Sequence, residues 1–273
     1  MTIKDDILAI MPNRISLNEP MKKHTSLKTG GTADIFVTPH NHNELLSLLK
    51  LCKEHSVSPI IIGAGSNILV SDNGLRNVVI QLLGDFQNFS LVSNSADTSL
   101  KVFAGAGLLN SRFIKSLVDN SLGGMEFLAT IPGRIGGAVV MNAGAFGKET
   151  SESILSVTYI DTITLESKEI KKKDCKFSYR KSIFHDKIVT GAFFQVIQQN
   201  PAISKKKIEE FRDIRANTQP LNAPNVGSIF KNPHGLFAVR RVPAIGSTIL
   251  PVSLSPGDVL QKTYRIERKL DAG

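Results

Sequence analysis

The chain has 273 residues, and its 33 Lys and Arg residues against 24 Asp and Glu residues give a formal net charge of +9. Apolar residues make up 41% and charged residues 21%, as in ordinary folded proteins, which excludes a disordered, collagen-like or coiled-coil chain. No stretch approaches the roughly 18 consecutive apolar residues of a membrane helix, and the first residues lack the pattern of a signal peptide. We therefore expect a folded cytoplasmic protein that is not inserted in a membrane.

The cysteines and the charge pattern narrow the classes of ligand. Cys52 and Cys175 are too few for a disulfide framework and lack the spacing of zinc ligands, so we expect reduced thiols and no metal site. The positive charge fits an anionic partner, either nucleic acid or a small phosphorylated ligand. The chain has three Tyr and no Trp, and its Lys triplets at 171–173 and 205–207 are not interleaved with aromatic residues. These features disfavour a base-stacking surface, so we expect a small-molecule partner and no nucleic acid.

The first elements in chain order are a strand, a helix and two further strands. Residues 33–39 have the pattern of a strand that ends at a proline, and residues 43–55 place leucines at near-helical spacing, with Asn43 as the predicted cap. Residues 60–62 and 77–82 are short apolar runs typical of buried strands. The strand, helix, strand order predicts one β-α-β unit.

The rest of the chain continues to alternate between the two kinds of element. Apolar runs predict strands, and three- to four-residue apolar spacing predicts helices. The predicted strands cover residues 100–104, 158–165 and 188–197, and the predicted helices cover 110–120 and 205–217, the last closed by Pro220. This pattern predicts the α+β class.

A glycine-rich loop follows the predicted strand at 60–62. Its main-chain N–H groups are little obstructed by side chains, and such a turn can hold a diphosphate without a charged side chain. We therefore predict a cofactor phosphate loop made of Gly63, Ala64, Gly65, Ser66 and Asn67. The β-type residues 68–70 exclude the Rossmann pattern, which needs a helix there. A glycine-rich hairpin without a ligand is the alternative.

A second cluster of small residues covers 129–147. Its backbone can approach a flat or extended cofactor closely, and an ordinary core strand does not need so many small residues in series. The predicted cofactor-binding residues of this cluster are Gly133, Gly137, Asn142 and Gly144. A tightly packed turn region without a ligand is the alternative.

Two polar motifs complete the candidate site. Within residues 177–184, Arg180 lies between aromatic residues and can hold a carboxylate or a developing enolate with two parallel donors. Within residues 225–233, Ser228 follows a glycine on a predicted turn, where its hydroxyl can donate a proton, and Lys231 adds a nearby cation. Alone, each would indicate only a surface salt bridge or a turn, but their occurrence together with both glycine clusters favours an enzyme site.

In combination, these motifs resemble the UDP-N-acetylenolpyruvoylglucosamine reductases, the MurB flavoenzymes of bacterial peptidoglycan synthesis. The residues that carry the resemblance are 24–31, 63–67, 131–147, 179–182 and 227–233. The motif order is kept from about residue 17 to residue 233. The family version without an extra Tyr-bearing loop is the more similar one, because little chain separates residues 217–220 from Gly227.

The resemblance implies the FAD-binding fold of the vanillyl-alcohol oxidase (PCMH) class. In that fold two α+β subdomains hold FAD, and a third domain closes over the sugar nucleotide. We accordingly expect residues 1–200 to form the FAD-binding domain, with its subdomains divided near residue 85, and residues 201–273 to form part of the substrate-binding domain.

The resemblance also implies a reaction in two halves. NADPH reduces FAD, and hydride then passes to the enolpyruvyl double bond to give UDP-N-acetylmuramate. Hydride addition leaves negative charge on an enolate, which needs a cation and a proton donor. By resemblance, Arg180 stabilises that charge and Ser228 donates the proton. Tyr179, Lys231 and Asn232 are the expected substrate-binding residues.

The resemblance fades after residue 233. From about residue 236 the chain lacks the family's helices and the segment with an active-site glutamate, so we expect a truncated or divergent substrate domain. A catalytically impaired flavin-binding remnant, a related flavin oxidase and a nucleic-acid-binding protein are the alternative functions. The sequence leaves the oligomeric state and the choice between NADPH and NADH open.

Overall fold

The structure is a computed structural model that describes residues 2–94, 97–219 and 222–227. The chain divides into the units Met1–Ala238 and Val239–Gly273, and all the features described here belong to the first. The predicted site residues Ser228, Lys231 and Asn232 lie outside the described residues, as does the divergent segment from residue 236.

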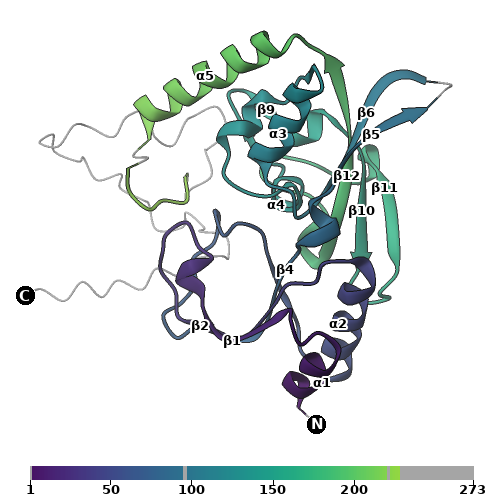
Figure 1. Ribbon diagram of the computed structural model, residues 1–273, viewed down its shortest axis with the longest axis vertical. Helices are drawn as coiled ribbons and strands as arrows, with labels where there is room; N and C mark the ends of the chain where they lie inside the picture. The colour runs from purple at the N-terminus through teal and green to yellow at the C-terminus, as the bar shows by residue number, and fades with distance from the viewer. Residues whose placement is uncertain (1, 95–96, 220–221, 228–273) are drawn as a thin grey trace, which may run out of the picture. The chain divides into compact units, whose positions relative to one another are not determined.

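A four-stranded sheet forms the N-terminal part of this unit (Figure 1). Its order is β1 (Ile15–Pro20), β2 (Thr32–Val37), β4 (Leu75–Gln81) and β3 (Ile60–Ile62). Strand β1 is antiparallel to β2, whereas β2 and β3 are both parallel to β4. Helix α2 (His42–Glu54) connects β2 to β3, which confirms the predicted β-α-β unit, and α1 (Ile3–Ile10) packs against α2.

Strand β4 of this sheet packs against a buried apolar cluster on each face. Successive side chains of a strand point to opposite faces, and in β4 Val78 and Ile80 join the main apolar core while Val79 joins a second cluster. The main core includes Leu45 and Leu48 of α2. The second cluster includes Met21, from the short 3-10 helix Met21–Lys23. Ile62 and Ile68, which flank the 63–67 loop, also pack in the second cluster, so apolar packing anchors both ends of the predicted phosphate loop.

A larger antiparallel sheet follows. Its order is β11 (Ser167–Lys171), β10 (Ile154–Asp161), β12 (Lys187–Gln198), β6 (Asp97–Gly105) and β5 (Phe89–Asn94), and β7 (Leu122–Gly123) pairs with the end of β12. The short strands β8 (Gly144–Ala145) and β9 (Lys148–Glu149) form a separate hairpin.

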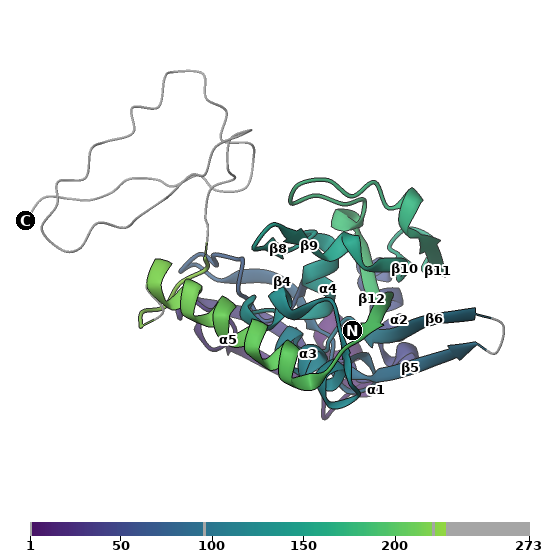
Figure 2. The same cartoon turned by 90° about the horizontal axis from the view of Figure 1, so that it is seen from above.

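Three helices accompany the second sheet (Figures 1 and 2). They are α3 (Asn110–Asp119), α4 (Ile135–Val140) and α5 (Pro201–Thr218). Helix α4 packs on β12 and β6, while α5 packs on α3 and on the 3-10 helix η3 (Glu126–Thr130). Further 3-10 turns cover Gly84–Gln87, Thr150–Glu152, Lys172–Asp174 and Phe184–Asp186.

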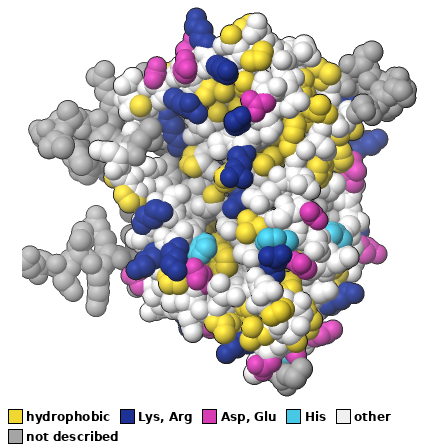
Figure 3. Space-filling model, viewed as in Figure 1, with side chains coloured by type: hydrophobic (Ala, Val, Ile, Leu, Met, Phe, Trp, Pro, Cys, Tyr) yellow, Lys and Arg dark blue, Asp and Glu magenta, His cyan; other side chains and the backbone are white. Residues whose placement is uncertain are grey.

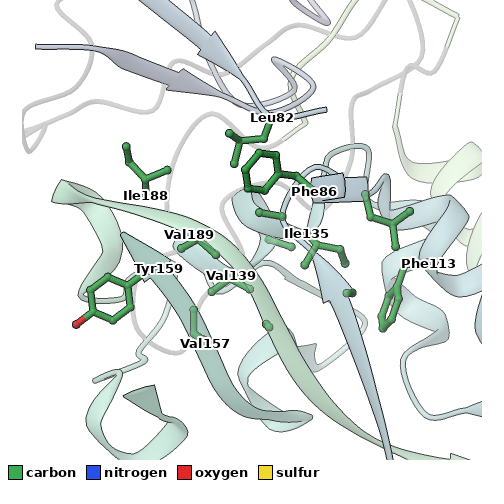
Figure 4. Packing of buried hydrophobic residues seen from close by; sticks show 14 of the residues in the cluster. Leu82, Phe86, Phe113, Ile135, Val139, Val157, Tyr159, Ile188 and Val189 are labelled. Atoms are coloured by element: carbon green, nitrogen blue, oxygen red, sulfur yellow. The ribbon is translucent and has the colours of Figure 1, made fainter. Parts of the chain in front are cut away.

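One continuous apolar core connects the two sheets. Leu82 and Phe86, from the connection between the sheets, belong to the same buried cluster as Ile135 and Val139 of α4. Figure 4 shows these side chains close to Val189 of the second sheet. The connection between the sheets is therefore fixed by burial of apolar surface rather than left as a free linker.

Most predicted elements are confirmed, with four corrections. Asn41, not Asn43, caps α2, because its side chain accepts from the Glu44 amide. Residues 68–70 form no strand, but no helix follows the loop either, so the exclusion of the Rossmann pattern stands. The strand predicted over 158–165 is Ile154–Asp161, since a turn begins at residue 162. Helix α5 begins at Pro201, earlier than predicted. The α+β class is confirmed.

Candidate functional site

The 63–67 loop leaves β3 through a turn that only glycine permits. Gly65 has φ +61°, and a Cβ at this position would collide with the main-chain oxygen of His24. The Ser26 amide donates to the Gly65 carbonyl at 3.0 Å, and the Gln81 side chain donates to the Gly63 carbonyl at 2.6 Å. The loop is therefore held through the carbonyl groups of Gly63 and Gly65. Its N–H groups take no part in these two hydrogen bonds.

The structure brings the two glycine clusters together. The Ser66 hydroxyl donates to the Pro132 carbonyl at 2.7 Å. Gly133 lies beside it with φ +150°, and its carbonyl accepts from the Asn110 amide at 3.0 Å. Asn110 also donates from its side chain to the Ile131 carbonyl at 3.0 Å. The start of α3 and the 131–133 turn thus form a wall opposite the 63–67 loop.

A pocket of about 670 Å³ lies between these segments, within the 300–1,000 Å³ typical of ligand sites. It is lined by Ser26, Lys28, Ala64, Leu109, Ser111, residues 129–133, Arg212, Arg215 and residues 223–225. Helix α3 has no side-chain cap at its first turn, where Ser111 faces the pocket. Among the described residues, the amides of Ala64, Gly65 and Ser66 have no hydrogen-bond acceptor. Ala64 lines the pocket on one side, and the uncapped first turn of α3 carries Ser111 on the other. Main-chain N–H groups of this kind suit an anionic group.

Cationic side chains also make the pocket suitable for an anionic group. Lys28, Arg212 and Arg215 line the pocket, and burial lowers the pKa of Arg215. Burial, together with the nearby Arg112 charge, likewise lowers the pKa of Arg134. Figure 3 shows Lys and Arg side chains over the central part of the viewed face, with Asp and Glu side chains both among them and at its edge. An anion in the pocket would relieve the cost of burying these charges.

Arg215 also fastens α5 to the wall of the pocket. Its Nη1 donates to the Thr130 carbonyl, and its Nε donates to Gln219 at 2.9 Å. Helix α5 therefore fixes the end of η3, from which the 131–133 turn begins.

Two observations test whether the described residues fit FAD. First, the buried atoms Asn110 Oδ1 and Arg134 Nε have no hydrogen-bond partner among the described residues, so an acceptor and a donor remain beside the glycine clusters. Second, a Cβ on Gly137 would meet nothing within 4 Å, and Gly137 lies on the exposed side of α4, opposite the buried Ile135, Ala138 and Val139. Open space at a predicted cofactor-binding glycine, and unused polar atoms beside the glycine clusters, fit a large polar cofactor such as FAD.

Arg180 lies at the tip of a tight turn. Ser178 and Lys181 exchange main-chain hydrogen bonds of 3.0 and 3.1 Å, and Arg180 between them has φ +54°. Its guanidinium donates from Nη2 to the Gly144 carbonyl at 2.8 Å and from Nη1 to the Asn142 carbonyl at 3.3 Å. The guanidinium carbon also lies 4.8 Å from the Tyr179 ring centroid. The structure thus joins the predicted catalytic arginine to the second glycine cluster.

Asn142 occupies the centre of this junction. It is completely buried with φ +41°, and its side chain donates to Glu149 Oε2 at 2.7 Å and to the Ser178 carbonyl at 3.1 Å. Its Oδ1 accepts from the Ser151 amide at 2.9 Å. These contacts position the loops around it, and its direct contact with a cofactor stays a prediction.

A smaller pocket of about 270 Å³ adjoins this junction. Gly144, Ala145 and Phe146 line one side of it, and Thr218 and Gln219 of the α5 end line the other. Phe146 stacks on Phe211 of α5 with ring centroids 4.2 Å apart. Thr130 and Arg215 line both pockets, so the two pockets share a wall.

The structure adds site residues that the sequence analysis did not identify. Asn110, Ser111, Arg212 and Arg215 are the clearest, because they line or support the larger pocket. Arg212 and Arg215 lie three positions apart in α5, which places them on one side of the helix. That this side faces the pocket follows from the packing of α5 on η3. No metal site appears, since no cluster of three His, Cys, Asp or Glu residues occurs in the described part of the chain. That part also contains no helix with the length and hydropathy to cross a bilayer.

Comparison with known proteins gives these features a family. A family model described as "FAD binding domain" matches residues 33–163. The UDP-N-acetylenolpyruvoylglucosamine reductase of Lachnoclostridium phytofermentans is 37% identical over 237 residues, covering 85% of this chain and 75% of the relative. The protein of the same name from Clostridioides difficile is 38% identical over 236 residues, again covering 85% of this chain and 75% of the relative.

A solved structure agrees with the sequence relatives. The crystal structure of UDP-N-acetylenolpyruvylglucosamine reductase (MurB) from Thermus caldophilus superimposes with a TM-score of 0.66 at 28% identity, over 82% of this chain and 76% of the other. The FAD-binding fold of the PCMH type that the resemblance implied is thereby confirmed. The chain therefore belongs to the UDP-N-acetylenolpyruvoylglucosamine reductase family of FAD-linked oxidoreductases.

Proposed function

We propose that this protein reduces the enolpyruvyl group of UDP-N-acetylglucosamine enolpyruvate to give UDP-N-acetylmuramate in the cytoplasm, with FAD as bound cofactor and NADPH as reductant. The observation that carries the proposal is the position of Arg180, whose guanidinium reaches the Gly144 carbonyl beside the second glycine cluster. Family membership supports the same reaction. A cation next to a cofactor cradle is what hydride addition to an enolpyruvyl carboxylate requires.

We assign the cofactor to the cradle between the glycine clusters. Gly63, Ala64, Gly65, Ser66 and Asn67 on one side and Gly133, Gly137 and Gly144 on the other would hold it, with main-chain donors toward the diphosphate. When bound, the flavin supplies the acceptor and donor of hydride that no side chain can provide. Ser66 fixes the separation of the two sides through its bond to Pro132. In this assignment Arg215, which lines the pocket, holds the wall through the Thr130 carbonyl.

The remaining chemistry belongs to side chains. Arg180 stabilises the negative charge that develops on the substrate carboxylate and the neighbouring carbon, and it is held in place by two carbonyl groups. Tyr179 lies against the guanidinium and limits its motion. Ser228 is the proposed proton donor, and Lys231 and Asn232 are proposed substrate contacts. All three are assigned by family resemblance alone.

The proposed domain boundaries are also based on the resemblance to the family. We propose residues 1–200 as the FAD-binding domain, divided near residue 85, and residues 201–273 as part of the substrate domain. The change from one sheet to the other across Leu82 and Phe86 supports the division near residue 85.

Separate measurement of the two half-reactions tests the proposed function. The FAD-loaded protein is mixed anaerobically with NADPH, and loss of the oxidised flavin absorbance is followed; the enolpyruvyl sugar nucleotide is then added. Recovery of the oxidised spectrum on that addition is the expected result.

The same experiment separates the alternatives. Bleaching by NADPH without recovery on adding the sugar nucleotide would indicate a catalytically impaired flavin-binding protein. Recovery only on adding oxygen, with hydrogen peroxide formed, would indicate an oxidase. If the protein took up no flavin and bound DNA with a steep dependence on salt concentration, the charge would instead serve nucleic acid binding.

A further inference from the structure

Glu149 is the acidic partner of Arg180. Its Oε1 lies 3.8 Å from Arg180 Nη1, and the two side chains are 33% and 29% exposed. This separation is longer than a hydrogen bond, so the carboxylate acts on the guanidinium chiefly through its charge. Of the described residues, Glu149 alone forms an ion pair with Arg180.

The second oxygen of Glu149 reaches the base of the Arg180 turn. Oε2 accepts from the Asn142 side chain at 2.7 Å, and the same amide group donates to the Ser178 carbonyl. Ser178 forms one end of the turn that carries Arg180. One carboxylate thus contacts the guanidinium directly and supports the turn through a completely buried asparagine.

The charged neighbours Lys148 and Glu152 form no ion pair with Arg180 or Glu149 in the described part of the chain. Lys148 pairs instead with Glu152 at 3.0 Å, and Glu152 also accepts from the Glu149 amide at 2.8 Å. The two glutamates form a reciprocal capping box, in which each side chain accepts from the main-chain amide of the other. Only the Glu149 carboxylate also contacts Asn142 and Arg180.

We propose that Glu149 is a positioning residue that orients Arg180 and partly neutralises it, so that a ligand carboxylate must compete with the Glu149 carboxylate for the guanidinium. The inference rests on the proposed function, because it assumes that Arg180 receives the enolpyruvyl carboxylate. Glu149 then has two opposing effects. It keeps Arg180 in a productive geometry, and it weakens the attraction of Arg180 for an anion bound before reaction.

The substitution Glu149→Gln tests this, because an amide oxygen can still accept from Asn142 while the charge is lost. Ligand binding is measured by the change in the flavin absorbance of the FAD-loaded protein. UDP-N-acetylmuramate, which carries the carboxylate, is expected to bind about two- to five-fold more tightly to the variant, the range for a partly exposed ion pair. UDP-N-acetylglucosamine, which lacks the carboxylate, is expected to bind as in wild type. In turnover, KM for the enolpyruvyl substrate and kcat are both expected to fall.

Glu152→Gln is the matched control, since it makes the same change on the same turn without an Arg180 contact, and it should leave the affinity ratio of the two ligands unchanged. The double substitution Glu149→Gln with Arg180→Gln, compared with Arg180→Gln alone, tests whether Glu149 acts on the ligand through Arg180. If Glu149 acts through Arg180, its substitution has no further effect on the ratio when Arg180 is absent. Should Glu149→Gln fail to fold, Glu149→Asp, which withdraws the carboxylate by one methylene, is expected to shift the ratio in the same direction by less.

An unchanged ratio in a folded Glu149 variant, or an equal weakening of both ligands, would overturn the inference and leave the proposed function intact. Failure of the wild-type protein to distinguish the two ligands would overturn the proposed function together with the inference.

Discussion

Arg180 Nη2 donates to the Gly144 carbonyl at 2.8 Å, so the candidate catalytic cation and the second glycine cluster form one rigid unit. The Ser182 hydroxyl strengthens the connection by donating to the Val140 carbonyl at 2.7 Å. A displacement of the 178–182 segment would therefore move the wall of the cofactor cradle as well. A substitution of Arg180 can therefore affect the cofactor cradle as well as the reaction of the substrate.

Arg180→Lys is expected to impair the second half-reaction selectively. Lysine keeps the charge but loses the planar fork that bridges the Asn142 and Gly144 carbonyls and receives a carboxylate. Oxidation of the reduced flavin by the enolpyruvyl substrate should slow about 10²- to 10³-fold, the usual loss for one charge-stabilising donor. Flavin reduction by NADPH should change far less. Stopped-flow absorbance of each half-reaction measures both, and equal slowing of the two would argue for general damage to the cradle.

Gly137→Ala tests whether the open space beside Gly137 is occupied by the cofactor. No described atom lies within 4 Å of a Cβ at this position, and alanine is favoured over glycine within a helix. The apoprotein should therefore melt at the same or a slightly higher temperature, while its affinity for FAD falls. Thermal melting with and without FAD measures both effects. An unchanged FAD affinity would place the cofactor away from Gly137.

Gly65→Ala should behave in the opposite manner. The added methyl group would collide with the main-chain oxygen of His24, and φ +61° is strained for alanine. We expect the apoprotein itself to lose about 1–3 kcal/mol of unfolding free energy, a typical cost of such strain. Urea unfolding of the apoprotein measures this loss. A wild-type midpoint would show that the loop readily changes its path.

Glu19 links the phosphate loop to acid stability. The side-chain hydrogen bond with His24 lowers the pKa of Glu19, and His24 stacks on Phe36 with centroids 4.2 Å apart. A lowered pKa in the folded state stabilises the protein above about pH 4.3, the ordinary pKa of glutamate, and this contribution is lost as the pH falls through the lowered pKa. Glu19→Gln should therefore lower the melting temperature at pH 7 and narrow its gap to wild type as the pH falls toward 3. A gap that widens on acidification would contradict this assignment.

Both cysteines should be inert in the folded protein. Cys52 and Cys175 are buried, and burial raises the pKa of each thiol to about 11. The thiolate is the reactive form, so at pH 7.5 neither should react rapidly with a disulfide reagent. Thiol titration should detect both groups only after denaturation. Fast reaction of either one in the native protein would show that its environment opens readily.

The sequence predicted elements well where local pattern and burial agree. Strand β3 matches its predicted bounds, because three isoleucines are followed at once by a glycine. Helix α4 was not predicted, since its two glycines are poor helix formers and tertiary packing on β12 stabilises it. The early start of α5 is encoded by Asn200 and Pro201, a helix cap and a first-turn proline, and these residues lie outside the apolar repeat that predicts the rest of the helix.

The candidate site could be predicted only where its residues form a local sequence pattern. The glycine clusters and Arg180 carry local signals, and the structure shows that Ser66 meets Pro132 and that Arg180 meets Gly144. Arg215 and Asn110 carry no such signal, because their importance arises only when α5 and α3 pack beside η3. The hydrogen bonds of Asn142 with Glu149, Ser178 and Ser151 carry no sequence signal either, and its contact with the cofactor stays a prediction. Side-chain hydrogen bonds of this kind depend on segments distant in sequence, which spacing alone does not reveal.

The proposed reaction depends most on FAD occupying the cradle between residues 63–67 and 131–137. The direct test is a titration of the purified protein with FAD, followed by the visible spectrum after removal of free flavin. We predict a yellow protein with about one flavin per chain and an absorbance band shifted from that of free FAD. A protein that stays colourless after incubation with excess FAD would contradict the assignment of the cradle and of the reaction built upon it.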